Sequence, residues 1–529
     1  NRYYVVEGNK RVSVLKYFKA DSIVANVTRK IPKYSEDEDV KLYYEYMRFN
    51  QISGLNNIEF SKIGMVDKLL ALMGSTAIWD ADTRMEFNSL VNHFTKAYEF
   101  RGGRKLPIRV GDALTAFINV YGYNTVLGMS DDELSLNIVK CWNEFVMLTE
   151  KQSVGLVMDP LAAEERKGRS IFSYFMPSSA KKFTVAFLYP KSPDTSDWIY
   201  AHDLGRNYLE ETFPDQMKTI CVNDVTEERT EQVLNDVIRQ GADIIFEVAP
   251  QMMKDSLKVA VDHPDVKILN CSLNTSHKYI RTYYARMYEA KFLSGMIAGA
   301  LAENDRIAYI ADYPIYGMIA NINAFALGAS FTNPRARIYL AWSTSENYDR
   351  ERFLKDNNIQ VVSDQDMITP RDPGRQFGLY ECSKDGRKLN LVMPLWNWGV
   401  FYEKMIQSIL AGSYQSEENS EGRALNYWWG MSAGVIDLIC SKNVPTGVKR
   451  LVDHLKSDIK KGDIVPFYGE IRAQDGTLKN KKDKAMKPEA IMEMDWLTDN
   501  VIGEIPTMGE LRAEARPVVQ IKGVEEKMK

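Results

Sequence analysis

The chain has 529 residues, which is too long for a single hydrophobic core, so two or three domains are expected. A hydrophobic share of 45% and a charged share of 26% are typical of a folded globular protein. The net charge of −4 gives no general attraction to nucleic acid or to an anionic membrane. No apolar run approaches the roughly 20 residues that a membrane-spanning helix needs.

Cysteine and histidine usage favours a reducing compartment and a site without metal. The cysteines are scattered singly, with no CxxC pair, at Cys141, Cys221, Cys271, Cys382 and Cys440. The five histidines show no metal-ligand spacing. The start, NRYYVVEGNKR, has no apolar signal segment. We therefore expect a cytoplasmic protein without metal or cofactor. The alternative is an extracytoplasmic or lipid-anchored protein whose N-terminal signal has been lost.

The first residues predict a small α+β unit. Residues 3–6 and 22–28 have strand patterns, and 11–18 have a short helical pattern. The stretch VVEGNKRVSVLKYF resembles a box of the ParB-like nuclease or partition-protein fold. The resemblance implies a ParB-like domain over 1–75. Because that fold has an earlier strand, we expect this domain to be truncated at its N-terminus.

Within this box, Gly8, Lys10 and Arg11 form a candidate phosphate site. Gly8 permits a tight turn, and the two cations stand at a helix N-terminus, where free amides favour anions. A nucleotide or DNA is the partner that such a site implies. The alternative is that both cations are ordinary solvated surface charges.

Residues 76–176 predict a helical region and linker, with helices at 83–100, 110–121 and 131–149. A partition protein would carry a helix-turn-helix here. The segment 130–150 is acidic, however, and offers no basic recognition helix. A helical connector is therefore the preferred interpretation, with a linker at 150–182.

From residue 183 strands and helices alternate, which predicts parallel sheets. The first unit is a buried strand, a turn rich in Pro, Ser and Asp, and a helix capped by Ser196 or Asp197. The predicted strands are 183–189, 217–222, 243–248, 266–270, 306–310, 335–341 and 359–362. The predicted helices are 198–213, 226–240, 250–262, 286–302, 315–331 and 346–357. The pattern restarts near Arg306, which predicts two lobes around a cleft.

This half resembles the BMP (basic membrane protein) family of substrate-binding proteins, the PnrA-like or Med-like group. The matching stretches are DWIYAHDLGRNYLEE at 197–211, YYARMYEAKFLSGMIAG at 283–299, INAFALGASFTNP at 322–334, SDQDMITP at 363–370, LWNWGVFYEK at 395–404, WWGMSAGVIDL at 428–438 and MDWL at 494–497. The resemblance runs from Phe183 to Pro506. It implies a type I periplasmic-binding-protein fold, with two doubly wound α/β lobes, over 177–510. Residues 511–529 are then a C-terminal tail.

The resemblance also implies a cleft that binds a purine nucleoside or nucleobase. The candidate ligand-binding residues are Asp194, Asp197, Trp198, Glu247, Tyr313, Pro314, Trp342, Gln365, Asp366, Glu381, Trp396 and Trp398. Trp198 and Trp396 are expected to sandwich a flat ring, while carboxylates and amides bind its polar edge. The alternative for each tryptophan is core packing.

One departure from the family favours the free base. Nucleoside binders of the group hold ribose with an aspartate and then a lysine in the next strand. Here Glu381 stands near the aspartate and Trp396 near the lysine. An indole removes a ribose donor and fills its space, so adenine is favoured over a nucleoside.

The function expected is a non-enzymatic purine sensor that regulates the ParB-like domain. The first alternative is the binding component of an ABC nucleoside transporter, with a permease as partner. The second is nucleotide hydrolysis or nuclease activity in the N-terminal domain, although no Walker loop, HExxH or nucleophile–base pair is visible.

Overall fold

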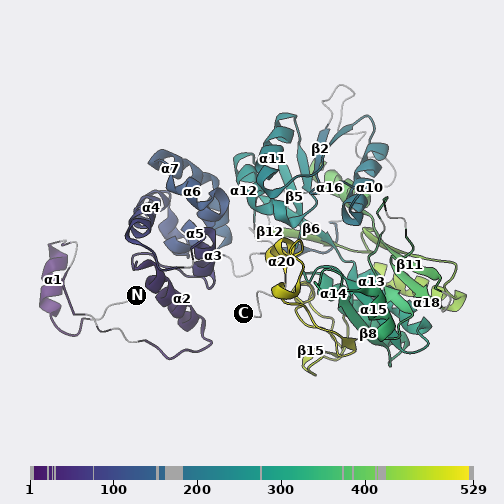
Figure 1. Cartoon of the computed structure of the whole chain (residues 1–529). Helices are drawn as coiled ribbons and strands as arrows, with labels where there is room; N and C mark the ends of the chain where they lie inside the picture. The colour runs from purple at the N-terminus through teal and green to yellow at the C-terminus, as the bar shows by residue number, and fades with distance from the viewer. Residues whose placement is uncertain are drawn as a thin grey trace.

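The computed structural model describes residues 5–18, 20, 23–26, 28, 31–75, 77–149, 154–160, 183–273, 277–367, 369–371, 374–383, 386–411, 414 and 424–523. Figure 1 shows a helical domain beside a larger α/β domain. Most of the predicted linker, and the first part of the predicted strand at 3–6, lie outside the described residues.

The N-terminal part is helical. Its elements are α1 (Asn9–Tyr17), α2 (Glu38–Ser53), α3 (Met65–Leu72), α4 (Ala81–Phe100), η1 (Gly103–Lys105), α5 (Val110–Tyr121), α6 (Tyr123–Leu127), α7 (Asp131–Lys140) and α8 (Trp142–Met147). Local signals set the helix starts. The Asp80 side chain accepts from the Thr83 amide at the start of α4, and Ser130 with Glu133 forms a capping box at α7. Helices α2 to α8 pack into one bundle.

The ParB-like domain expected over 1–75 is not seen in the described residues. Residues 5–6 and 23–26 form no strand, and no residue of α1 is buried. Instead, Phe49 of α2 and Leu69 of α3 lie in the same apolar core as Phe94 of α4. The boundary expected near residue 75 therefore falls inside the bundle, because apolar contacts join both sides of it.

The first lobe is built on a wholly parallel sheet in the order β1-β12-β6-β5-β4-β2-β3. Its strands are β1 (Val154–Val157), β2 (Phe183–Leu188), β3 (Met217–Val222), β4 (Ile244–Glu247), β5 (Lys267–Cys271), β6 (Ile280–Ala285) and β12 (Ala424–Trp429). Its other elements are α10 (Asp197–Thr212), η2 (Glu227–Arg229), α11 (Thr230–Arg239), η3 (Pro250–Met252), α12 (Met253–Asp262) and α16 (Trp398–Leu410). The central strands are almost fully buried, as continuous apolar runs between two helical layers should be.

The second lobe has the sheet order β13-β11-β10-β9-β7-β8-β16. Its strands are β7 (Arg306–Ala311), β8 (Arg337–Trp342), β9 (Val361–Ser363), β10 (Leu379–Cys382), β11 (Lys388–Trp396), β13 (Ile436–Cys440) and β16 (Val501–Ile502). Its helices are α13 (Tyr288–Leu301), α14 (Met318–Thr332), α15 (Arg350–Asp356) and α18 (Thr446–Lys461). The sheet is mixed, since β9, β10, β11 and β13 pair antiparallel. The expectation of parallel sheets is therefore wrong for this edge.

The final part of the chain holds β14 (Ile471–Arg472), β15 (Leu478–Asn480), α19 (Pro488–Met492), η4 (Met508–Glu510) and α20 (Arg516–Lys522). The two lobes share one strand order, β3-β2-β4-β5-β6 in the first and β8-β7-β9-β10-β11 in the second. In each, the first strand along the chain lies between the second and the third, as in doubly wound folds. The chain passes between the lobes after β6, after β11 and after β12. This is the type I periplasmic-binding-protein fold that the sequence predicted.

The linker strand β1 is attached where the lobes join. It pairs with β12, and the guanidinium of Arg286 donates to the Met158 carbonyl at 2.6 Å. Arg286 also donates to Glu289 at 2.7 Å and to the Ser432 hydroxyl at 3.0 Å. Arg286 is 6% exposed, so these buried bonds fix residues 154–159 to the hinge.

The helical bundle packs on the outer face of the first lobe. Apolar residues of α4, α5 and α8 form one continuous cluster with residues of α11 and α12. At its rim, Lys140 pairs with Asp262 at 2.5 Å, and Glu144 pairs with His277 at 3.0 Å. Within the described part of the chain, no helix is both long enough and apolar enough to cross a bilayer.

Candidate ligand-binding site

A cavity of about 630 Å³ lies between the two lobes. Its walls are the loops that follow β2, β4 and β5 of the first lobe and β7, β8 and β9 of the second. These loops meet because the carboxyl ends of the parallel strands in both sheets face the same gap. Such a position is where ligands bind in open α/β sheets, and the volume suits a drug-sized molecule.

The start of α10 carries two lining residues, Asp197 and Trp198. The Ser196 hydroxyl accepts from the Ile199 amide at 3.4 Å and begins the helix there. The Trp198 indole N–H donates to the Val248 carbonyl at 2.9 Å, which fixes the ring against the end of β4. Both side chains are therefore held by local structure on the cavity wall.

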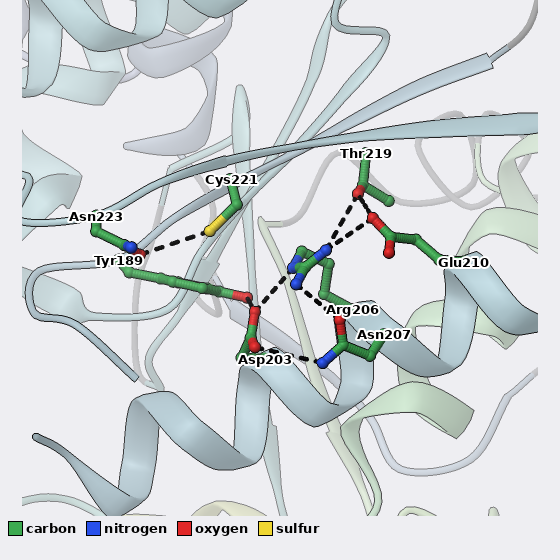
Figure 2. A network of polar contacts seen from close by, with 8 residues as sticks. All are labelled: Tyr189, Asp203, Arg206, Asn207, Glu210, Thr219, Cys221 and Asn223. Atoms are coloured by element: carbon green, nitrogen blue, oxygen red, sulfur yellow. Dashed lines mark hydrogen bonds and ion pairs between the residues drawn. The ribbon is translucent and has the colours of Figure 1, made fainter. Parts of the chain in front are cut away.

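Further along α10, a polar network ties the helix to the neighbouring strands (Figure 2). Arg206 donates to Asp203 at 2.8 Å, to Glu210 at 2.7 Å and to Asn207 at 2.7 Å. Tyr189 donates to Asp203 at 3.3 Å. Thr219, on β3, also contacts Glu210. These contacts fix α10 against β3 and the end of β2. The first turn of the helix, which carries Asp197 and Trp198, is therefore held in place.

The aromatic residues beneath the cavity form one packed cluster. The Trp198 and Trp396 ring centroids are 5.2 Å apart at an interplanar angle of 82°. Trp396 stacks on Trp398 at 5.5 Å, and Trp198 stacks on Tyr284 at 5.9 Å. A sandwiched ring needs two parallel faces about 7 Å apart, twice the usual carbon–carbon contact distance. The predicted Trp198–Trp396 sandwich is therefore wrong for this structure, since the two rings touch edge to face.

An ion pair lies in the wall of the cavity. The Lys291 ammonium is 2.5 Å from Asp366, with side chains that are 4% and 14% exposed. The Trp396 indole N–H donates to the other Asp366 oxygen at 3.3 Å. Burial alone would lower the pKa of Lys291, but the adjacent Asp366 carboxylate outweighs it and raises that pKa. Lys291 therefore stays charged.

Further carboxylates give the cavity a negative character. Burial, reinforced by Asp312 and Asp366, raises the pKa of Asp197 to about 6. Burial also raises the pKa of Asp312, whose carboxylate accepts from the Ser343 hydroxyl. Such groups can accept hydrogen bonds from a ligand rich in N–H or O–H donors. Among the described residues no group of three or more His, Cys, Asp or Glu side chains is placed to hold a metal ion.

Half of the predicted site residues line this cavity: Asp197, Trp198, Tyr313, Gln365, Asp366 and Trp396. They come from both lobes and from four different strand ends. Whether they contact a ligand remains a prediction, but the fold does bring them together.

The other six predicted residues lie outside the lining, for separate reasons. Asp194 is exposed and faces Arg371 at 3.9 Å. Glu247 is fully buried, where it bonds to Ser256 and accepts from Asn270 at 2.8 Å.

The remaining four predicted residues are two tryptophans that pack in the core, a glutamate within a strand and a buried proline. Trp342 is 5% exposed and donates to the Glu504 carbonyl at 2.8 Å. Trp398 is 1% exposed and stacks on the His202 ring at 4.4 Å. Glu381 is held in register within β10, and Pro314 is buried beside the lining residue Tyr313. Core packing is thus the role of the two tryptophans.

Gly8, Lys10 and Arg11 also lie outside the cavity. Gly8 has φ of 88° at the start of α1, as a turn glycine there should, and both cations are exposed. Phosphate binding at this point remains a prediction.

Sequence reasoning missed several lining residues. They are Tyr284, Lys291, Tyr309, Asp312, Asn321, Ser343, Thr344, Arg512 and Glu514, among others. Lys291 carried a usable signal, because it is a lone cation inside the apolar helical run YEAKFLSGMIAGAL. Its presence also means that the cavity has an ammonium group although Trp396 stands where the family lysine was expected.

Comparison with known families identifies the domain. Residues 182–352 match the Bmp family, described as ABC transporter substrate-binding protein PnrA-like. We call residues 182–352 the Bmp-family segment after this match. Because that family is one of substrate-binding proteins, the match supports a ligand-binding function for this part of the chain.

Two curated relatives extend the match beyond the Bmp-family segment. A purine-binding protein of Brucella abortus is 27% identical over 339 residues, which is 62% of this chain and 95% of that protein. A Haloferax volcanii protein, named for glucose binding in an ABC transporter, is 24% identical over 344 residues, covering 63% and 83% of the two chains.

Solved structures also resemble the Bmp-family part. A solute-binding protein of an ABC transporter from Conexibacter woesei is 15% identical with a TM-score of 0.41, and covers 54% of this chain and 98% of its own. A transcriptional activator of the comK gene from Bacillus halodurans is 14% identical with a TM-score of 0.41, and covers 54% and 99%.

Proposed function

We propose that the two-lobe domain binds a purine and performs no chemistry on it. The observation that carries this proposal is the composition of the cavity wall, which joins an aromatic cluster to several carboxylates. A ring that stacks on Trp198 or Trp396 gains about 1 kcal/mol beyond the burial of its surface. The carboxylates of Asp197 and Asp312 can accept hydrogen bonds from the N–H groups at the edge of a purine.

The charge of the cavity supports a ligand without phosphate. Asp197, Asp312 and Asp366 line it, and its buried ammonium, Lys291, is already paired with Asp366. The lining has five carboxylates, of Asp197, Asp312, Asp364, Asp366 and Glu514, against three cations, Lys191, Lys291 and Arg512, so a phosphate would meet a net negative charge. We therefore expect nucleobases and nucleosides to bind and nucleotides to be excluded.

Among uncharged purines we favour adenine. Trp396 occupies the place where a ribose-binding lysine was expected, and Lys291 is engaged by Asp366 at 2.5 Å. Lys291 is therefore not free to donate to a ribose. The similarity to a protein named as purine-binding agrees with this choice of ligand class.

A sugar is the second candidate. Aromatic faces beside carboxylates also suit pyranose rings, whose hydroxyl groups donate to carboxylate oxygens. The relative named for glucose binding is the specific observation in its favour.

We also propose that the helical bundle, rather than a transporter, receives the signal in a cytoplasmic protein. The support is the continuous apolar cluster between the bundle and the first lobe. A change in lobe position would act directly on that contact. Delivery of the ligand to an ABC transporter permease is the alternative, and transport assays with a candidate permease would reveal it.

Calorimetry with the full chain tests the ligand. We expect adenine to bind more tightly than adenosine, and AMP and glucose to give no heat. Trp396→Ala should weaken adenine binding about 5- to 150-fold, corresponding to ~1–3 kcal/mol. The matched control is Trp342→Ala, which removes a tryptophan outside the lining and should leave Kd unchanged. Tighter binding of glucose than of any purine would overturn the proposal.

A further inference from the structure

The C-terminal segment, residues 507–523, forms part of the cavity wall. Arg512, Glu514, Ala515 and Val518 line the cavity together with the loops of both lobes. Residues 507–523 therefore add to the wall that the loops of the two lobes form around the ligand site.

Backbone hydrogen bonds attach the segment to the second lobe. The Arg512 amide donates to the Thr344 carbonyl at 2.9 Å, and the Glu346 amide donates to the Glu510 carbonyl at 2.9 Å. Leu511 forms an isolated β-bridge with Ser345. These bonds hold the start of the segment next to Thr344, which itself lines the cavity.

A small apolar cluster holds the rest of the segment. Leu511, Ala515 and Val519 are 0%, 1% and 3% exposed and pack against Tyr313 and Ile315. Both of those second-lobe residues line the cavity. Because this cluster is separate from the main cores, the segment can leave without opening them.

The segment also contacts the first lobe. Helix α20 packs against η3, and Pro250 and Gln251 of η3 line the cavity. Figure 1 shows α20 between the helices of the first lobe and the C-terminal part of the second. One short stretch of chain therefore touches lining elements of both lobes.

We propose that the C-terminal segment is a third wall of the ligand site that controls entry and release. While it is docked, Arg512 and Glu514 stand at the mouth of the cavity and the segment links the lobes. Ligand exchange then requires the apolar cluster of Leu511, Ala515 and Val519 to separate from the second lobe. The role in ligand release rests on the proposed purine-binding function, but the control of access does not.

Alkylation of Cys271 tests access without any ligand. Cys271 lines the cavity and is 2% exposed, Cys221 is exposed, and Cys141 is buried in the helical bundle. The full chain is treated with N-ethylmaleimide, and peptide mass spectrometry measures the rate at which each of these three cysteines is modified. Cys221 is the internal reference for reactivity, and Cys141 reports global unfolding.

Val519→Asp should undock the segment, because it places a charge in the apolar cluster. We expect Cys271 to react at least about tenfold faster, with Cys141 unchanged. The matched control is Gln520→Asp, which adds the same charge at the next, exposed position and should change nothing. If Val519→Asp also exposes Cys141, Arg516→Ala decides the question. Arg516→Ala removes a hydrogen bond to the Leu511 carbonyl and a surface ion pair to Glu346. It should increase the alkylation rate of Cys271 about threefold. Unchanged Cys271 reactivity in a folded variant would overturn the proposal.

Stopped-flow fluorescence with adenine measures release. Loss of residues 507–529 should raise the dissociation rate at least about tenfold in a chain whose Cys141 stays protected. If adenine binds neither form, the purine proposal fails, while the Cys271 rates still decide on access. If adenine binds both forms with equal dissociation rates, the segment has no role in release.

Discussion

The Lys291–Asp366 pair offers the sharpest test of the cavity wall. Lys291→Met keeps the length of the side chain but removes its charge, so the Asp366 carboxylate loses its ammonium partner and keeps the Trp396 indole donor at 3.3 Å. Breaking a buried ion pair by removing one partner destabilises by about 3–5 kcal/mol. Because Asp366 remains 14% exposed, we expect the lower end, about 3 kcal/mol. For a domain of this size that is a fall of roughly 4 °C in Tm.

A double-mutant cycle measures the pair itself. Adding Asp366→Asn to Lys291→Met removes the unpaired carboxylate, and we expect stability to recover to within about 1 kcal/mol of the wild type. Urea unfolding followed by tryptophan fluorescence gives the free energies. The matched control is Lys258→Met, which breaks a half-exposed pair with Glu231 and should change stability by less than about 1 kcal/mol. If Lys291→Met matched this control, the pair would be solvated and the description of a buried ion pair in the cavity wall would be refuted.

Three further predictions concern single residues. Because the pKa of Asp197 is about 6, adenine binding that uses its carboxylate should tighten as pH rises from 5 to 7, and calorimetry should find that dependence absent in Asp197→Asn. Burial raises the pKa of Glu247 from 4.5 to about 7, so its ionisation destabilises the fold progressively as pH rises from about 4.5 through 7, and the wild type should gain stability as pH falls from 8 to 5. Glu247→Gln should remove about 3 kcal/mol of this variation in thermal unfolding, and an unchanged profile would contradict the raised pKa. Gly205→Ala should destabilise by about 1–3 kcal/mol, since its Cβ would lie 2.9 Å from the Trp398 Cβ, whereas Gly447→Ala, with open space around it, should be neutral in the same urea unfolding. Equal effects of the two alanines would mean that α10 and α16 are not in close contact.

The strands and helices around the cavity were largely predictable. Residues 217–222 were predicted as a strand and form β3, and 110–121 were predicted as a helix and form α5. These elements have strong apolar periodicity, which depends only on local sequence. The antiparallel strands β10 and β11 and the bridge to the C-terminal segment were not predicted, because their pairing depends on contacts between distant parts of the chain.

The sequence predicted where the site lies, but it predicted the directions of its side chains less well. Strand ends carry Asp197, Gln365 and Asp366 into the cavity, and the sequence places those ends correctly. Side-chain direction is a different matter, because Trp396 and Trp398 are two residues apart, yet one lines the cavity and the other packs on His202. The backbone changes from strand to helix between these two residues, at the end of β11 and the start of α16. The apolar pattern of the sequence does not predict the side-chain directions at such a junction.

Strand β1 has a consequence for how this protein can be divided. A recombinant fragment that starts at residue 177 would have the whole Bmp-family segment but would leave the outer side of β12 without its partner. An unpaired strand edge is a template for association with other chains. The same cut would leave Arg286 without the Met158 carbonyl and would uncover apolar residues of α12 that pack on the bundle. The start of the family match is therefore not the start of an independently folding unit. Residues before 177 cover part of the surface of the ligand-binding lobes.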